Sequence, residues 1–76
     1  MRNLSEIATD IEADWQPVYF GAVPYLSAMH TLETVEDSFY EDSGRSVVNY
    51  FLANAQSWRG ETARRIKKEL KELLSR

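Results

Sequence analysis

Side chains that commonly do chemistry are sparse in this chain. It has one histidine, His30, and no cysteine, so neither a thiolate nucleophile nor a thiolate metal site is available. No serine stands at a spacing that ties it to His30 as a general base. The three glycines, Gly21, Gly44 and Gly60, are isolated and build no phosphate-binding loop. We therefore expect no catalytic residue, no cofactor and no metal, and we interpret the protein as not an enzyme.

The acidic residues of segment 33–42 are the other candidates for chemistry. They lack the alternating ligands and the central glycine of a calcium-binding loop. We expect at most weak, nonspecific cation binding from this segment.

A row of basic residues is the most distinctive feature of segment 61–76. A step of 100° per residue along a helix places four of these bases within one sector of about 100°, opposite the apolar side chains. This basic stripe consists of Arg64, Lys67, Lys68 and Lys71. We take it as the candidate interaction surface, for an acidic partner or for a phosphate backbone.

Two other interpretations of the basic stripe stay open. In the first it is a solvated outer face, stabilised by ion pairs four residues apart on the same helix. Those pairs are Glu61–Arg65, Arg65–Glu69 and Lys68–Glu72. In the second the helix lies on a membrane surface, which requires its apolar face to be free. So small a domain needs that face for its core, and we expect no membrane partner.

The charge is divided between the two halves of the chain. Residues 1–43 hold nine acids and one base, whereas residues 44–76 hold eight bases and three acids. The net charge is −3 and the pI is about 5.0. Opposite charges attract, so either the halves fold against each other or one half meets a partner of the opposite sign. The acidic partner within the chain would be the row on the first helix formed by Glu6, Asp10 and Asp14.

Length and composition indicate one small globular domain over residues 1–76. A chain of 76 residues buries only roughly 60–65% of the surface that its unfolded form exposes, so most apolar side chains are needed for the core. The 43% hydrophobic and 28% charged residues are typical of a folded, soluble protein. The longest uncharged apolar stretch, residues 18–26, is too short to span a bilayer. With no apolar signal sequence after Met1, we expect a cytoplasmic protein.

Apolar periodicity predicts helices in the first half of the chain. Residues 4–15 carry an amphipathic pattern, with Asn3 and Glu6 spaced as a capping box and Pro17 disfavouring helix beyond residue 15. A second helix is expected over residues 24–33, with Pro24 in its first turn. A Pro-kinked helix that begins at Val18 is the alternative.

The second half of the chain is predicted to hold a loop and two helices. Residues 34–42 are expected to form an ordered loop that Phe39 or Tyr40 pins. Ser43 is the expected N-cap of a third helix. We expect the helical pattern to break between residues 54 and 60. A fourth helix is expected over residues 58–74, with Ser57 as its cap. The apolar pattern also permits one helix over residues 43–75. Such a helix would be about 48 Å long, too long for this chain to cover.

Together these elements predict an all-α fold, a small bundle of three to four short helices in a single domain. The nine aromatic side chains are expected mainly in the core, since the spacing of many of them is helical. Tyr19 and Tyr40 are the aromatic residues that we expect in a contact surface.

Two strings carry a resemblance to known sequences. They are PYLSAM at residues 24–29 and YFLANAQSWRGETARRIK at residues 50–67. Both resemble short hypothetical proteins of actinobacteria and their phages or mobile elements. The resemblance implies a cytoplasmic protein and assigns no site residue.

Two function classes follow from the sequence. The first is a protein-interaction module or small regulator without catalytic activity, which binds a protein partner or a second copy of itself. The second is a nucleic-acid binder that uses the third and fourth helices as a helix-turn-helix, with the basic stripe near the major groove. We favour the first because the acidic half would oppose a phosphate backbone.

Overall fold

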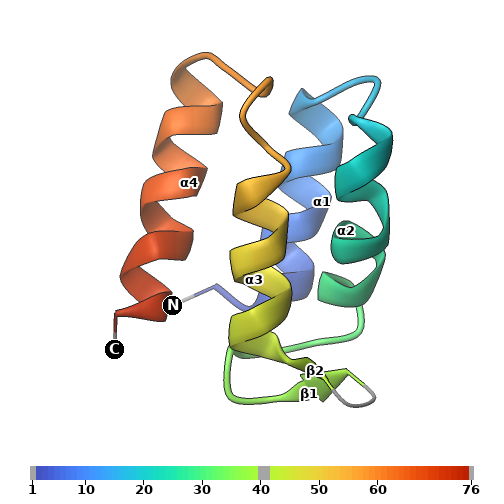
Figure 1. The fold of residues 1–76 in the computed structure, drawn as a ribbon. Coiled ribbons are helices and arrows are strands. Elements are labelled where there is room, and N and C mark those ends of the chain that lie inside the picture. The colour runs from blue at the N-terminus through green and yellow to red at the C-terminus, as the bar shows by residue number, and fades with distance from the viewer. Residues whose placement is uncertain (1, 40–41, 76) are drawn as a thin grey trace.

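The computed structural model describes residues 2–39 and 42–75, which are mostly helical (Figure 1). The α-helices of this part are α1 (Leu4–Asp14), α2 (Val23–Met29), α3 (Gly44–Ala53) and α4 (Glu61–Leu74). A 3₁₀ turn, η1 (Phe20–Ala22), precedes α2, and two short strands, β1 (Ser38–Phe39) and β2 (Asp42–Ser43), precede α3. The prediction of a small helical domain is confirmed.

Helix α1 begins and ends where the sequence predicts. The Asn3 side chain accepts a hydrogen bond from the Glu6 backbone N–H at 2.9 Å, and the Glu6 carboxylate accepts one from the Asn3 N–H at 3.1 Å. This capping box satisfies two N–H groups that have no partner within the helix. The helix ends at Asp14, with Trp15 as its C-cap. Its buried apolar stripe is Leu4, Ile7, Ala8 and Ile11.

Helix α2 is shorter than the predicted segment 24–33. It ends at Met29 because the chain then tightens, with the Leu32 N–H donating to the Met29 carbonyl at 3.2 Å. The Glu33 carbonyl then accepts a hydrogen bond from the Leu4 N–H of α1 at 2.9 Å. This bond joins two segments that are far apart in the sequence. The alternative of a Pro-kinked helix from Val18 is wrong, since residue 18 lies outside the helices and a 3₁₀ turn, η1, precedes α2.

The segment between α2 and α3 contains a short pair of strands that the sequence did not predict. Strands β1 and β2 pair antiparallel, with Ser38 opposite Ser43 and Phe39 opposite Asp42. The expected pinning by Phe39 or Tyr40 lies outside the described residues, because only the backbone of Phe39 is described.

Contacts around Asp37 hold this segment to the start of α3. The Asp37 carboxylate accepts from the N–H groups of Glu33 and Thr34 at 3.0 and 3.1 Å. The Gly44 N–H donates to the Asp37 carbonyl at 2.6 Å. A Cβ atom on Gly44 would lie 2.9 Å from the Val35 Cα, so only glycine permits this close packing.

The break between α3 and α4 is confirmed, and the alternative of one long helix is wrong. Ser43 caps α3 as predicted, its hydroxyl accepting from the Ser46 N–H at 3.1 Å. Helix α4 begins at Glu61 rather than near Trp58, and its N-cap is Gly60 rather than Ser57. Gly60 has φ of 115°, a conformation that side chains disfavour, so the chain turns there before the helix begins.

The helices pack around one core. Helix α2 packs on α1 and α3, and α4 packs on α1 and α3, as Figure 1 shows. Trp15, Phe51 and Trp58 meet in this core: the two indole rings stack with centroids 5.6 Å apart, and the Phe51 ring lies edge-on to both. Phe20 and Tyr50, which were expected in the core, are exposed instead. Tyr25 is only partly buried and packs against the core.

Candidate functional site

The basic stripe lies on α4, with three of its four members exposed. The exposed members are Arg64, Lys68 and Lys71, which we call the basic surface. Within residues 2–39 and 42–75 these three side chains form no ion pair and no hydrogen bond. Their charge is therefore not neutralised by the described part of the chain.

The ion pairs expected along α4 are not formed. None of the described acids of α4 lies within ion-pair distance of a base on the same helix. Glu69, which was expected to pair with Arg65, instead binds Arg2 through two hydrogen bonds of 2.6 and 3.2 Å. The structure therefore does not support the interpretation of the stripe as a face stabilised by these ion pairs.

Lys67, the fourth member of the stripe, has a structural contact instead. Its ammonium group donates to the Trp58 carbonyl at 2.6 Å and lies 5.8 Å from the centroid of the Trp58 ring. Burial lowers the pKa of Lys67, and the positive charges of Lys71 and Arg59 lower it further. Lys67 therefore helps to hold the α3–α4 connection against α4, and Lys71 and Arg59 add to the positive potential around it.

The acidic row of α1 does not reach the basic surface. Asp10 forms an ion pair with Arg2, and Asp14 accepts a hydrogen bond from the Trp58 indole N–H at 2.9 Å. Arg2 thus bridges Asp10 on α1 and Glu69 on α4. Glu69 raises the pKa of Arg2 most, partial burial opposes this rise and Asp10 adds to it.

A second candidate surface is formed by aromatic side chains near η1, α2 and α3. Phe20 is 79% exposed, Tyr19 44% and Tyr50 51%. The rings of Tyr19 and Phe20 have centroids 4.8 Å apart, and those of Tyr25 and Tyr50 are 5.5 Å apart. We call these four residues the aromatic face.

Asn54, just after α3, connects the two ring pairs of the aromatic face. Its side chain donates to the Tyr50 carbonyl at 2.9 Å. A Cβ atom on Gly21 would lie 2.9 Å from the Asn54 Oδ1 and 2.6 Å from the Tyr19 ring. The glycine therefore lets the Tyr19 ring and Asn54 approach each other, so Asn54 lies next to Tyr19 and is hydrogen-bonded to the backbone of Tyr50.

A hollow of about 350 Å³ opens beside the aromatic face. It is lined by Tyr19, Ala53, Asn54, Gln56 and Ser57. Phe20 is not among the lining residues, and its ring contacts Tyr19 from outside the hollow.

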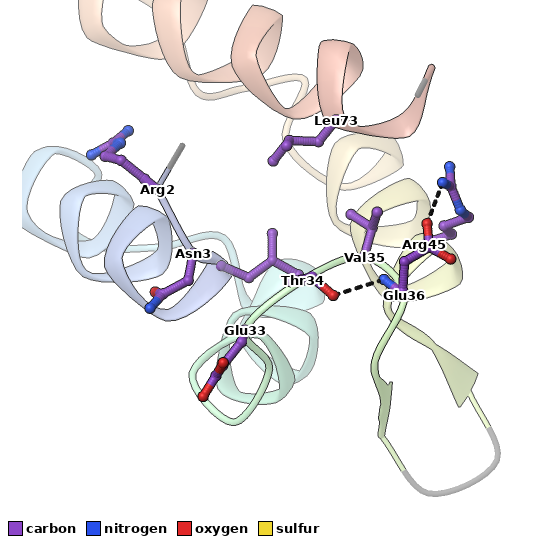
Figure 2. Close-up of a pocket in the computed structure, with 9 residues that line it drawn as sticks. Arg2, Asn3, Glu33, Thr34, Val35, Glu36, Arg45 and Leu73 are labelled. Carbon is purple, nitrogen blue, oxygen red and sulfur yellow. Dashed lines mark hydrogen bonds and ion pairs between the residues drawn. The ribbon is translucent and has the colours of Figure 1, made fainter.

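A further hollow of about 310 Å³ lies between the start of α1, residues 33–36 and the end of α4 (Figure 2). The side chains of Leu73 and Val35 face each other across it, whereas the guanidinium groups of Arg2 and Arg45 lie at its two ends and point away. Arg45 pairs with the Glu36 carboxylate at 2.5 Å and donates to the Leu74 carbonyl at 2.7 Å. This hollow is therefore an apolar depression whose cations are already bound within the chain.

In the part of the chain that the structure describes, His30 and the carboxylates do not form a metal-binding cluster. His30 lies on the surface, with its Nε2 2.8 Å from the Glu12 carboxylate. Among residues 2–39 and 42–75, no group of three or more histidine, aspartate or glutamate side chains is placed to hold a metal ion. No helix in the same residues is long and apolar enough to cross a membrane.

Comparison with known proteins adds no assignment to these surfaces. No protein-family model, curated protein or solved structure matches this chain. The assignment of function therefore depends on the contacts and charges described above.

Sequence reasoning found the basic stripe and Tyr19, but missed Phe20 and Tyr50 as surface residues. The signal for them is the absence of charge. Residues 15–32 and 46–58 contain no Asp, Glu, Lys or Arg. Exposed aromatic side chains within two uncharged segments that pack together indicate a contact surface.

Proposed function

We propose that this chain is a small cytoplasmic protein-interaction module that binds an acidic segment of a partner protein through the basic surface and catalyses no reaction. The single observation that carries this proposal is that Arg64, Lys68 and Lys71 are exposed together on α4 without an ion pair in the described chain. An acidic segment of a partner would supply the missing counter-charges.

The energetics of such contacts favour a transient complex. An exposed ion pair contributes about 0–1 kcal/mol, so three pairs at about 0.5 kcal/mol each give about 1.5 kcal/mol. This energy corresponds to roughly a tenfold change in affinity. Charge contacts of this kind act mainly on the association rate and on the choice of partner, and they weaken with salt.

Binding of nucleic acid is the second candidate, because the same basic surface would contact phosphates. The arrangement of α3 and α4 favours it less. Residues 54–60 join the two helices, whereas a helix-turn-helix has a turn of about three to four residues and helices crossing at about 90–120°. Figure 1 shows α3 and α4 side by side, and Lys67 is engaged with Trp58. The acidic first half would also oppose an extended phosphate backbone.

Two labelled probes separate these candidates: a peptide rich in glutamate and aspartate, and a random-sequence DNA duplex. Fluorescence anisotropy measures the binding of each to the full chain at low and physiological salt. The test variant is Arg64→Gln with Lys68→Gln and Lys71→Gln. The control variant reaches the same net charge through exposed positions on α1 and α2, and is Thr9→Glu with Ala13→Glu and Ser27→Glu.

We expect the acidic peptide to bind at low salt and to bind about tenfold more weakly to the test variant, with a smaller loss in the control. We expect no duplex binding tighter than about 10⁻⁴ M at physiological salt. Equal losses in the two variants would show that net charge alone matters and would overturn the assignment of the basic surface. Tight duplex binding that the test variant loses would reverse the order of the two candidates.

A further inference from the structure

The aromatic face is built from two segments of the chain that carry no Asp, Glu, Lys or Arg. The two uncharged segments, residues 15–32 and 46–58, contain α2 and most of α3, which pack against each other. The protein has 21 charged side chains, and all of them lie outside these segments. The aromatic face itself therefore adds no repulsion between like charges when two copies approach each other.

The aromatic face also carries a projection next to a depression. Phe20 is 79% exposed, and its ring contacts the ring of Tyr19. Tyr19 in turn lines the hollow of about 350 Å³. A cavity of about 150 Å³ is large enough for benzene, so this hollow has room for a phenyl ring.

We propose that the protein forms a symmetric homodimer through the aromatic face, in which Phe20 of each copy sits in the hollow of the other. A two-fold axis makes each surface its own partner, and a projection and a depression that adjoin each other on one face make that surface self-complementary. Tyr19 lies between the two features, and the axis therefore passes near Tyr19. This inference is independent of the proposed acidic partner, because α4 takes no part in it.

The size of the aromatic face agrees with a weak dimer. At about 200 Å² for a complete aromatic side chain, the exposed parts of Phe20, Tyr19 and Tyr50 amount to roughly 350 Å². A stable complex buries about 800 Å² on each partner, of which slightly more than half is apolar. The exposed aromatic area is therefore less than half of what a stable complex buries on each partner, and we expect a dissociation constant in the micromolar range.

A membrane surface fits the aromatic face less well. Helices that lie on membranes carry Lys and Arg beside their apolar side chains, and the segments that form this face have neither.

Sedimentation equilibrium of the full chain tests the dimer, over concentrations from about 5 to 500 µM that bracket a micromolar constant. The mass should rise from 8.8 kDa to twice that value. Phe20→Asp, which removes the projection, and Ala53→Trp, which fills the hollow, should each weaken dimerisation at least tenfold. Ala13→Asp, at an exposed position of α1, is the control for added charge and should dimerise as the parent does. Circular dichroism establishes that each variant is folded.

Salt and the basic surface provide two further controls. A dimer through the aromatic face should persist in about 1 M salt, where the Debye length is about 3 Å, whereas a dimer held by opposite charges should dissociate. The variant Arg64→Gln with Lys68→Gln and Lys71→Gln should dimerise normally. A parent protein that stays monomeric over the whole range overturns the proposal, as does a dimer that folded Phe20→Asp and Ala53→Trp leave unchanged. A monomer that sediments with phosphatidylcholine vesicles only when Phe20 is present would assign the face to a membrane instead.

Discussion

Substitution of Leu70 by alanine tests whether α4 is part of the core or an appended arm. Leu70 is fully buried on the side of α4 that faces α1 and α3. Leu→Ala at a buried position costs about 2–5 kcal/mol, because the transfer free energy of the side chain is lost and a cavity remains. A chain of this length has a total stability of about 4–11 kcal/mol. We therefore expect Leu70→Ala to remove about a fifth or more of the free energy of unfolding.

Thermal and urea unfolding, followed by tryptophan fluorescence, measure this loss. At about 4–8 °C per kcal/mol for a domain of this size, a loss of about 3 kcal/mol lowers the Tm by about 12–24 °C. Both tryptophans lie in the core, so their emission reports its disruption. Lys68→Ala, at an exposed position of the same helix, is the control for helix propensity and should change the Tm by only a few degrees. A Leu70→Ala protein that melts within about 4 °C of the parent would refute the packing of α4 described above.

Three further predictions concern single contacts. Gly60→Ala should lower the free energy of unfolding, measured in urea, by about 1–3 kcal/mol, because the backbone conformation of Gly60 is essentially restricted to glycine. A Cβ at this position would meet no other atom, so the cost comes from the backbone alone. An unchanged unfolding midpoint would contradict this prediction. A double-mutant cycle with Arg2→Gln and Glu69→Gln should give a coupling of about 0.5–1 kcal/mol that shrinks in salt, and zero coupling at low salt would show that the bridge contributes nothing. Burial lowers the pKa of Lys67 below its ordinary value of 10.5, so the folded protein releases this proton at lower pH than the unfolded chain. The free energy of unfolding should therefore rise between the two pKa values, relative to Lys67→Gln, and parallel curves for the two proteins would contradict the assignment.

The helix starts that the sequence predicts correctly depend on local contacts. The capping box of Asn3 and Glu6 lies within four residues, and the Ser43 cap reaches only to Ser46. The predicted end of α2 was four residues too late, because the chain tightens after Met29 and the Glu33 carbonyl instead accepts a hydrogen bond from the distant Leu4. The predicted start of α4 was wrong for a local reason. The N-cap is Gly60, which adopts a positive φ, and not Ser57 as the sequence suggests.

The same distinction applies to the candidate surfaces. Helical geometry alone places Arg64, Lys68 and Lys71 on one exposed side of α4, so the basic surface could be predicted. The partners of Glu69 and Lys67 could not be predicted, because they are Arg2 at the start of the chain and Trp58 in an irregular connection. The aromatic face requires α2 and α3 to pack together, and the spacing of residues along one helix does not give that information.

The contacts between α1 and the second half of the chain determine when the protein can fold during synthesis. Arg2 binds Glu69, 67 residues later, and Asp14 accepts its hydrogen bond from Trp58, 44 residues later. A ribosome adds about 5–20 residues per second, so α1 waits several seconds for these partners. Until α4 has left the exit tunnel, Ile7 and Ile11 have no complete core to enter. A nascent chain that ends before α4 therefore exposes the apolar stripe of α1, and arrested chains of increasing length should become protease-resistant only once α4 is outside the ribosome.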